Sequence, residues 1–387
     1  MKKIAVFGTH GLAQAFARKA RLLGVESHCF ARPLDDATRT AFDVCHEVSL
    51  ADVDALVREC EAAGIDGVLH TSEFTFRPAA LVAEALGLDG NPSSITREGG
   101  GITDKFRNRE CCRGVRGLGK VEYERVRDLR EVGERWRGRY PFIIKPTAEA
   151  GKRGVSIVRD EAELASAVRY TEGEPSRSSE YIVEILIPDG TNLSIEGLSF
   201  RGTHTILQVT NAVIDTAHHC AELGHQQPAL LAPGMREKVE ELDRQVLDAV
   251  GVVTGPTHTE MRVVGDEVYL IEVNARGGGD LISERLVELS TSYDYVSGMI
   301  LAALGDLAPI DASSLAHHHA GIWYVAEQTA YLQPVLVESA HAPWCVMRHV
   351  APGPLTLLTH NGQDHSYFVY RFEGACPEWV FEQQLRR

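Results

Sequence analysis

Short hydrophobic runs alternate with amphipathic segments through about the first hundred residues of the chain. The expected strands are residues 4–7, 25–30 and 67–70, and the expected helices are residues 12–23, 52–63 and 78–86. Short apolar runs separated by helical patterns are typical of a parallel sheet built from βαβ units. The pattern therefore predicts a doubly wound parallel sheet, and hence an α/β fold class, for the N-terminal part of the chain.

The pattern changes to closely spaced strands with few helices after about residue 115. The expected strands are residues 140–146, 155–158, 181–187, 194–200, 203–210, 259–264 and 268–274, and an amphipathic helix is expected over residues 235–250. Turn residues between neighbouring runs, such as Arg201-Gly202, indicate antiparallel hairpins. We therefore expect a small β-rich region followed by a mixed α+β region.

Composition narrows the possible functions. The chain carries 39 basic and 54 acidic residues, a net charge of −15, which argues against a general nucleic-acid-binding protein. No apolar run approaches the length that spans a membrane, and the eight cysteines show no spacing typical of a disulfide framework. We therefore expect a cytoplasmic protein with reduced thiols and with no nucleic-acid or membrane partner.

Two carboxylates lie in the hairpin expected around residues 265–267. If these three residues form the loop, Glu260 lies opposite Glu272, and Asn274 lies two residues further along the same face. Opposed carboxylates repel each other unless a cation lies between them, and two carboxylates with an amide oxygen suit Mg²⁺. A two-residue loop would instead place the two glutamates on opposite faces as solvated side chains. The hairpin alone leaves both registers open.

Two glycine-containing segments are candidates for binding anions. The loop between two expected strands carries Gly151, Arg153 and Gly154, and its backbone N–H groups and cations are suited to covering phosphates. Arg276 precedes a run of three glycines and an expected helix, and a helix N-terminus beside an arginine suits a carboxylate or a phosphate.

Other charged residues flank the N-terminal sheet. Glu73 follows the strand at residues 67–70, near the carboxyl end of a parallel sheet, where ligands bind in such folds, so we expect it to contact substrate. A basic helix opens near Lys105, and Arg107 and Arg109 are expected on its solvated face. The GxGxxG spacing of dinucleotide-binding sheets is absent after the first strand, which argues against an NAD-dependent oxidoreductase.

The order of these motifs resembles that of the ATP-grasp superfamily. The matching landmarks are Lys105, Ile143-Ile144-Lys145-Pro146, Val183-Glu184-Ile185-Leu186, Glu260, and Glu272-Val273-Asn274-Ala275-Arg276. The resemblance implies an N-terminal domain over residues 1–103, a small lid with a preceding helix over residues 104–187, and a C-terminal catalytic domain with a tail subdomain over residues 188–387. It also favours the register that places Glu260 opposite Glu272.

The resemblance further implies how ATP is held. Lys105 and Lys145 would contact its phosphates. The backbone of the hinge segment would read the adenine edge; this segment consists of Glu184, Ile185 and Leu186. Asn192 stands where the family often has an acidic residue, so an amide would contact the ribose hydroxyls.

Metal and phosphoryl contacts follow from the same resemblance. The implied ligands of Mg²⁺ are Glu260, Glu272 and Asn274, and Mn²⁺ is a plausible substitute. Arg276 would stabilise the transferring phosphoryl group or an acyl phosphate.

Within the superfamily, the chain looks most similar to the carboxylate–amine ligases that join amino acids, the L-amino-acid (dipeptide) ligase group. Residues 221–228 resemble that group's E-x-G-H-x-x-P loop, and residues 276–280 resemble its R-x-G-G-D run. The resemblance implies that Glu222 or His225 acts as a base for the amine. It also implies that Arg276 and the backbone of Gly278 and Gly279 hold a substrate carboxylate.

The implied reaction activates an amino-acid-like carboxylate as an acyl phosphate and couples it to an amine, releasing ADP and phosphate. The alternatives are an ATP-grasp enzyme with another acceptor (ring closure, bicarbonate or a purine precursor) and a nucleotide-binding regulatory module without turnover. Enzymes resembling this chain are usually dimers, so a homodimer is a further expectation.

Overall fold

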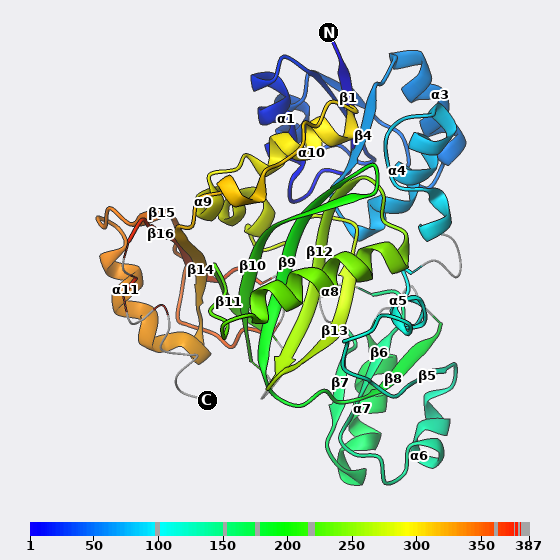
Figure 1. The fold of residues 1–387 in the computed structure, drawn as a ribbon, viewed down its shortest axis with the longest axis vertical. Helices are drawn as coiled ribbons and strands as arrows, with labels where there is room; N and C mark the ends of the chain where they lie inside the picture. Colours follow the sequence, from blue (N-terminus) through cyan, green and yellow to red (C-terminus); the bar gives the residue numbers. More distant parts are fainter. Residues whose placement is uncertain are drawn as a thin grey trace.

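A computed structural model describes residues 1–96, 101–149, 153–174, 179–215, 221–359, 363–374, 376–377 and 380 of the chain. Three sheets organise these residues, as Figure 1 shows. They follow one another along the sequence: a parallel sheet at the N-terminus, a small antiparallel sheet, and a large antiparallel sheet that includes the C-terminal strands. The mixed α/β architecture predicted from the sequence is confirmed, while the exact domain boundaries stay a prediction.

The N-terminal sheet has four parallel strands in the order β3-β2-β1-β4. They are β1 (Lys3–Phe7), β2 (Glu26–Phe30), β3 (Val44–His46) and β4 (Gly67–His70). The helices around them are α1 (Ala13–Leu22), α2 (Asp36–Ala41), α3 (Val53–Ala63) and α4 (Glu73–Leu86). The three predicted strands are confirmed. The short strand β3 escaped prediction because only Val44 and Cys45 are apolar in it, too few to show a period.

The small sheet has the order β5-β8-β6-β7. Its strands are β5 (Tyr123–Val126), β6 (Phe142–Pro146), β7 (Ser156–Val158) and β8 (Tyr181–Ile185). Helix α5 (Lys105–Cys112) precedes it, and α6 (Val132–Arg135) and α7 (Glu161–Gly173) belong to it. Trp136, Phe142 and Val183 are buried in a core of its own.

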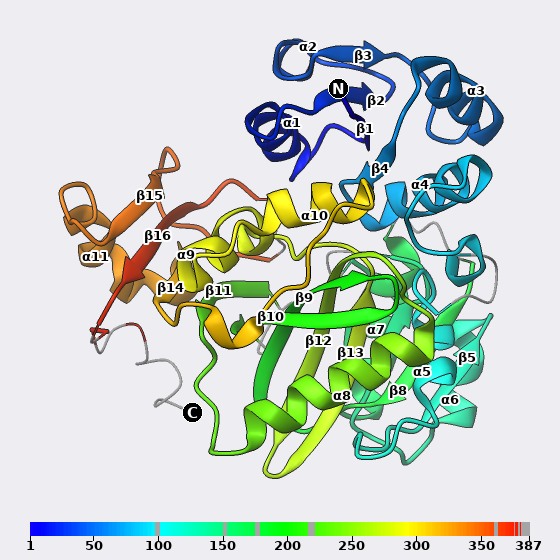
Figure 2. The same cartoon turned by 45° about the horizontal axis from the view of Figure 1, so that its top comes forward.

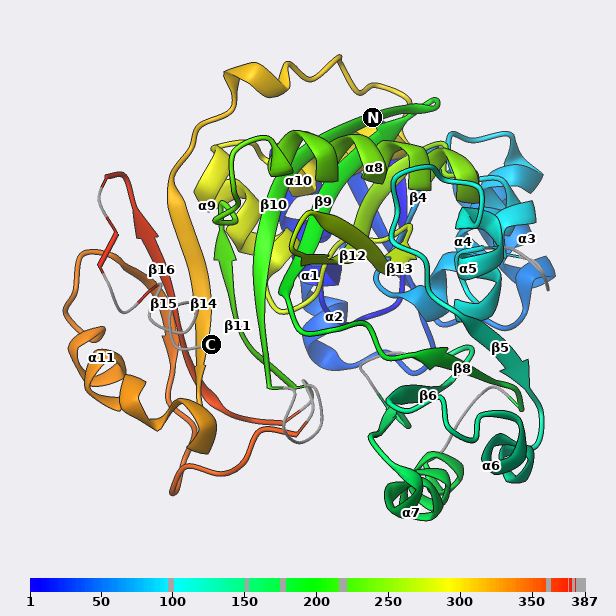
Figure 3. The ribbon, with the colours of Figure 1, turned by 60° about the horizontal axis from the view of Figure 1, so that its bottom comes forward.

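The large sheet has eight strands in the order β13-β12-β9-β10-β11-β14-β16-β15. They are β9 (Thr191–Phe200), β10 (Thr203–Asp215), β11 (Ala221–Gln227), β12 (Gly255–Val264), β13 (Glu267–Asn274), β14 (His319–Val325), β15 (Cys345–His349) and β16 (Ser366–Phe372). Helix α8 (Met235–Val250) packs its apolar stripe on one face of this sheet, as Figure 3 shows. The remaining helices are α9 (Val287–Thr291), α10 (Tyr295–Ala303) and α11 (Gln333–Glu338).

Helix α10 joins the N-terminal sheet to the large sheet (Figure 2). Its residues Tyr295, Met299 and Ile300 are fully buried in a core that also contains Ile4 and Val6 of β1. At the far end of β4, the ring Nε2 of His70 lies 2.9 Å from the Ala275 carbonyl oxygen. The N-terminal sheet is therefore fixed against the segment that follows β13. Among the described residues, no helix is long and apolar enough to cross a membrane.

The β12–β13 hairpin reaches the predicted pairing by an unpredicted route. Val264 pairs with Glu267, so the loop has two residues, and the predicted three-residue loop is wrong. A β-bulge then shifts the register: Met261 pairs with Leu270 but Glu260 pairs with Glu272. The extra residue, Ile271, places two residues of β13 against one of β12. The bulge thus reverses the effect of the shorter loop, and the two glutamates face each other as predicted.

Candidate functional site

A cavity of about 420 Å³ lies where the N-terminal sheet, the small sheet and the large sheet meet. Thr71 and Glu73 from the N-terminal part line it, as do Lys145 and Arg153 from the small sheet. Most of the residues predicted to act on substrates line the same cavity: Glu73, Lys105, Lys145, Arg153, Glu184, Ile185, Leu186, Asn192, Glu222, His225, Glu260, Glu272, Arg276, Gly278 and Gly279.

Two predicted residues within the described part of the chain are not in the cavity lining. Asn274 lies at the end of β13, buried to 4% exposure and paired with His258 across the ladder. Gly154 sits in a turn with φ of +66°, where a side chain would be strained. Gly151 lies outside the described residues. The predicted roles of Asn274 and Gly154 therefore rest on the resemblance and not on their place in this structure.

The hairpin end of the cavity holds the opposed carboxylates and a lysine. The pairing of β12 with β13 sets Glu260 opposite Glu272, and the bulge brings Ile271 to the cavity lining beside Glu272. Lys105 Nζ lies 3.1 Å from Glu272 Oε1 and donates to the Glu149 carbonyl oxygen at 2.6 Å. Helix α5 begins at Lys105 because Asp104 caps it, its carboxylate accepting from the Arg107 N–H.

A second cation cluster surrounds Glu184 in the centre of β8. Its carboxylate is 2% exposed and pairs with the Lys145 amine and, at 2.6 Å, with Arg109 Nε. Burial alone would raise the pKa of Glu184, but Arg109 and Lys145 lower it to about 2. Arg109 is itself buried, so the predicted solvated position is wrong: α5 turns this residue toward β8 and the Leu270 carbonyl oxygen.

The hinge segment offers fewer backbone donors than predicted. The N–H of Ile185 donates to the Glu122 carbonyl at 3.0 Å, and the N–H of Leu186 donates to the Pro141 carbonyl at 3.1 Å. Both N–H donors are thus engaged by carbonyl groups at the small sheet, so an adenine contact by the predicted hinge backbone would use its carbonyl oxygens, and that contact stays a prediction. Ile187 also lines the cavity, so the chain just after β8 is the better candidate for an N–H contact to adenine.

The amide of Asn192 is fixed by a neighbouring arginine. Asn192 Oδ1 accepts from Arg262 Nε at 2.8 Å, and Arg262 also donates to the Ile187 carbonyl at 3.0 Å. Both side chains line the cavity. Arg262 was not predicted as a site residue, although it stands two residues after Glu260 in the strand, on the same face.

Arg276 connects the hairpin end to the glycine run. Its Nε lies 3.3 Å from Glu73 Oε2, and its Nη1 donates to the Gly277 carbonyl at 2.9 Å. Burial would lower the pKa of Arg276, but the charges of Glu73, Glu272 and Glu260 raise it. The arginine therefore stays a cation inside the cavity, within the field of both hairpin carboxylates.

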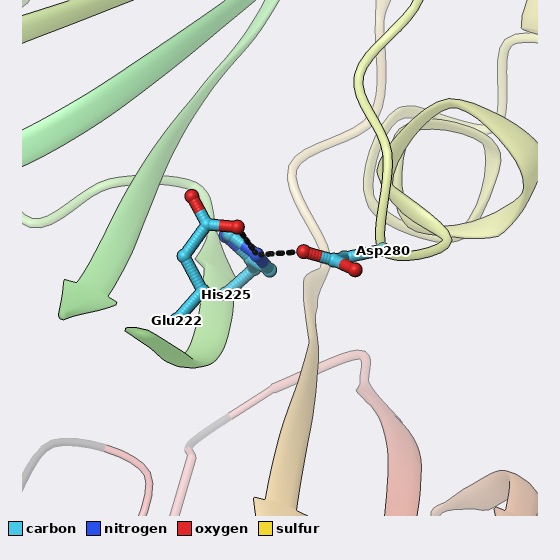
Figure 4. Close-up of side chains that lie close together, drawn as sticks. All are labelled: Glu222, His225 and Asp280. Atoms are coloured by element: carbon cyan, nitrogen blue, oxygen red, sulfur yellow. Dashed lines mark hydrogen bonds and ion pairs between the residues drawn. The ribbon is translucent and has the colours of Figure 1, made fainter. Parts of the chain in front are cut away.

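The other end of the cavity, here called the loop end, holds two carboxylates and a histidine (Figure 4). Ligand atoms of Glu222, His225 and Asp280 all lie within 4.8 Å of one another. His225 Nε2 is 3.4 Å from Asp280 Oδ2 and 3.9 Å from Glu222 Oε2. Burial raises the pKa of Asp280, and the charge of Glu222 adds to this effect, while the hydrogen bond to His225 lowers it. Asp280 was not among the predicted catalytic residues, although the sequence displays it at the end of the R-x-G-G-D run.

The N–H of Gly278 points away from any substrate anion. It donates to Glu196 Oε2 at 3.1 Å, which corrects the prediction that this donor holds a substrate carboxylate. Glu196 is fully buried and its Oε1 lies 2.5 Å from His258 Nδ1. Burial would lower the pKa of His258, but Glu196 raises it to about 10. The sequence prediction missed both residues. Glu196 follows Asn192 and Ser194 at alternate positions of β9, a pattern typical of a solvated face, and only His258, two residues before Glu260, carried a usable signal.

The hairpin carboxylates fit a divalent cation. Glu260 and Glu272 are hard oxygen donors placed opposite each other, and Lys105 already offsets part of their charge. Two carboxylates near phosphate-binding cations suit Mg²⁺ held jointly with a nucleotide. Glu260 and Glu272 would hold the ion, which would neutralise charge on phosphate oxygens.

Comparisons with known proteins agree with this geometry. The ATP-grasp domain family matches residues 138–284. Formate-dependent phosphoribosylglycinamide formyltransferase from Escherichia coli (strain K12) is 25% identical over 336 residues, covering 79% of this chain and 78% of that protein.

Two solved structures share the whole fold. The L-amino acid ligase from Bacillus licheniformis has a TM-score of 0.79 at 21% identity, covering 100% of this chain and 97% of that one. An N5-carboxyaminoimidazole ribonucleotide synthetase in its ADP complex has a TM-score of 0.77 at 16% identity, covering 100% and 96%. The chain therefore carries an ATP-grasp domain over residues 138–284 and shares its overall fold with these two enzymes.

Proposed function

We propose that this chain is an ATP-dependent carboxylate–amine ligase that joins an amino-acid-like carboxylate to an amine and forms an amide. One observation carries the proposal: a single cavity has a hairpin end with opposed carboxylates and three cations, and a loop end with an acidic cluster around His225. The first suits a metal–nucleotide complex, and the second suits an ammonium group.

The first step would take place at the hairpin end. A substrate carboxylate oxygen attacks the γ-phosphorus of ATP. The bond from this phosphorus to the β–γ bridging oxygen breaks, ADP departs, and the substrate becomes an acyl phosphate. Lys105, Lys145 and Arg276 are placed to stabilise the negative charge of the transferring group. Glu260 and Glu272 would hold Mg²⁺, which supplies further charge neutralisation when it is bound.

The second step would take place between the glycine run and the loop end. The amine nitrogen attacks the acyl carbon, the carbon–oxygen bond to phosphate breaks, and inorganic phosphate leaves. The ammonium group must lose one proton before its nitrogen can attack and a second proton as the amide forms, and Glu222, His225 and Asp280 would accept these protons. The shared fold with an L-amino acid ligase supports an amino acid as the amine, while the fold shared with a purine-pathway synthetase keeps another acceptor as the second candidate.

Incubation with ATP, Mg²⁺ and paired amino acids, read by mass spectrometry, tests the proposal. ADP, phosphate and a product whose mass equals two substrates less one water are expected. A product of one substrate less water would indicate ring closure. AMP and pyrophosphate would contradict an acyl phosphate altogether.

A further inference from the structure

A buried acid–histidine pair, of which His258 lines the cavity, touches both the hairpin and the glycine run. Glu196 of β9 and His258 of β12 are direct neighbours across the ladder between these strands. Glu196 is fully buried and His258 is 5% exposed. The 2.5 Å contact between Oε1 and Nδ1 joins two charged groups inside the protein.

Each member of the pair also contacts a part of the site. Glu196 Oε2 accepts from the Gly278 N–H at 3.1 Å and from the Ser283 hydroxyl at 3.4 Å. On the other side, His258 Nε2 lies 3.7 Å from Glu260 Oε1. A continuous path of polar contacts therefore runs from the glycine run, through the pair, to a hairpin carboxylate.

Gly278 packs tightly against the acid–histidine pair. A Cβ atom added to Gly278 would lie 2.7 Å from Glu196 Oε1 and 2.9 Å from His258 Nδ1, so the glycine run can only rest directly on the pair. A buried ion pair is weak evidence for stability, because apolar residues of similar volume often serve as well. A role in placing the site explains better why two charges are kept here.

We propose that Glu196 and His258 are positioning residues, which hold the Gly278 peptide and the Glu260 carboxylate in a fixed relation so that the metal site and the acyl-transfer site stay aligned. This proposal rests on the proposed function, because the metal site and the acyl-transfer site need to be aligned only if the chain uses both in one reaction. It concerns the metal affinity of the chain directly, and metal affinity can be measured without any amide product.

The test is the double variant Glu196→Gln with His258→Asn, which removes both charges and keeps neutral hydrogen-bonding groups. A single variant would leave an unpaired buried charge and confuse instability with misplacement. Ser199→Ala is the matched control: its hydroxyl is buried in the same strand, β9, and its partner is the ring Nδ1 of His204 at 2.7 Å.

Isothermal titration of Mg²⁺ into the ADP-saturated protein gives the deciding number, and thermal unfolding checks the fold. We expect the double variant to unfold within a few degrees of the unaltered protein while its Mg²⁺ dissociation constant rises about tenfold or more, as for other groups that orient a ligand. Ser199→Ala should leave the Mg²⁺ constant unchanged. A folded double variant with unaltered Mg²⁺ affinity overturns the proposal.

Two further outcomes are separable. If the double variant does not fold, Ser283→Ala replaces it, because this change removes one partner of Glu196 without leaving a buried charge; an Mg²⁺ constant equal to that of the unaltered protein then overturns the proposal. If the unaltered protein binds Mg²⁺ and ADP but makes no amide, the proposed function is wrong, while the Mg²⁺ constants still decide the role of the pair.

Discussion

At the hairpin end of the cavity each carboxylate group faces a cation, whereas at the loop end two carboxylates share one histidine. Glu272 faces Lys105 at 3.1 Å, and Glu184 has Arg109 and Lys145, which lower its pKa to about 2. Asp280 shows the opposite shift, since burial and Glu222 raise its pKa.

The difference indicates which ligand each end can take. At the hairpin end, the lysines pair with carboxylates in this structure. If a divalent cation takes their place at the carboxylates, the lysines can contact phosphates instead. The loop end gathers two carboxylates around one histidine, and this arrangement suits a cationic group such as an ammonium ion. The comparison thus separates the two half-reactions in space, and each prediction below tests one side of it.

The largest effect is expected from removing a cation at the hairpin end. Arg109→Leu would leave Glu184 buried with Lys145 alone, and breaking a buried pair costs about 3–5 kcal/mol of unfolding free energy. Urea denaturation at neutral pH measures the loss. Arg116→Leu, at an exposed position beyond the same helix, is the control and should cost less than about 0.5 kcal/mol. Equal stability of the two variants would show that Arg109 does not compensate Glu184.

The next effect concerns the metal carboxylates. Glu272→Gln keeps the side-chain volume but removes a charged oxygen ligand, so substrate-dependent ADP release should fall about 100-fold or more. Glu267→Gln makes the same change at an exposed position of the same hairpin and should leave the rate unaltered. ADP release at saturating substrates is the measurement, and normal turnover by Glu272→Gln would refute the metal site.

A smaller and more selective effect is expected at the loop end. Glu222→Gln should slow amide formation about 10- to 100-fold, since proton acceptance by a placed group contributes at least that much. Carboxylate-dependent ADP release without the amine should change much less, because the hairpin end is untouched. Measuring both rates on one preparation sharpens the comparison, and a parallel fall of the two rates would contradict it.

The smallest effect is expected at a buried carboxyl group away from the cavity. Asp243 of α8 is fully buried beside Thr259, and burial raises its pKa to about 7 from an ordinary value of 3.8. The folded state therefore holds a proton that the unfolded state releases, so this residue costs stability as pH rises from about 4 to about 7.

Asp243→Asn should remove that cost and raise the unfolding temperature at pH 8 by several degrees, with little change at pH 4. Glu237→Gln, at an exposed position of the same helix, should show no such pH dependence. Calorimetric scans at the two pH values provide the measurement, and an equal effect at both would rule out the raised pKa.

Much of this architecture could be predicted because it depends on local pattern. Apolar runs predicted the strands β1, β2 and β4, and the amphipathic pattern predicted helix α8 at its observed bounds. Glu222 and His225 of the loop end could be predicted from motif resemblance, since short motifs place chemistry in order along the chain even when their geometry is unknown.

The failures involve contacts between distant segments. The solvated assignment of Arg109 was wrong because its partner Glu184 lies 75 residues later, and no periodicity in α5 announces it. Glu196 was missed for a similar reason: it occupies a polar position of an alternating strand, and its burial and its partner appear only after β9 and β12 have paired. The register of the hairpin depended on a bulge, which no turn sequence encodes.

The β-bulge compensates for the length of the turn in this hairpin. A two-residue turn with one extra residue at Ile271 and a three-residue turn with none lead to the same facing glutamates. Turn length can therefore drift among relatives without loss of the metal face, provided that the strand gains or loses one residue in step. Deleting one residue of β13 would leave the turn unchanged but would destroy the facing pair of glutamates at the cavity. Inserting one residue in the turn would restore that pair.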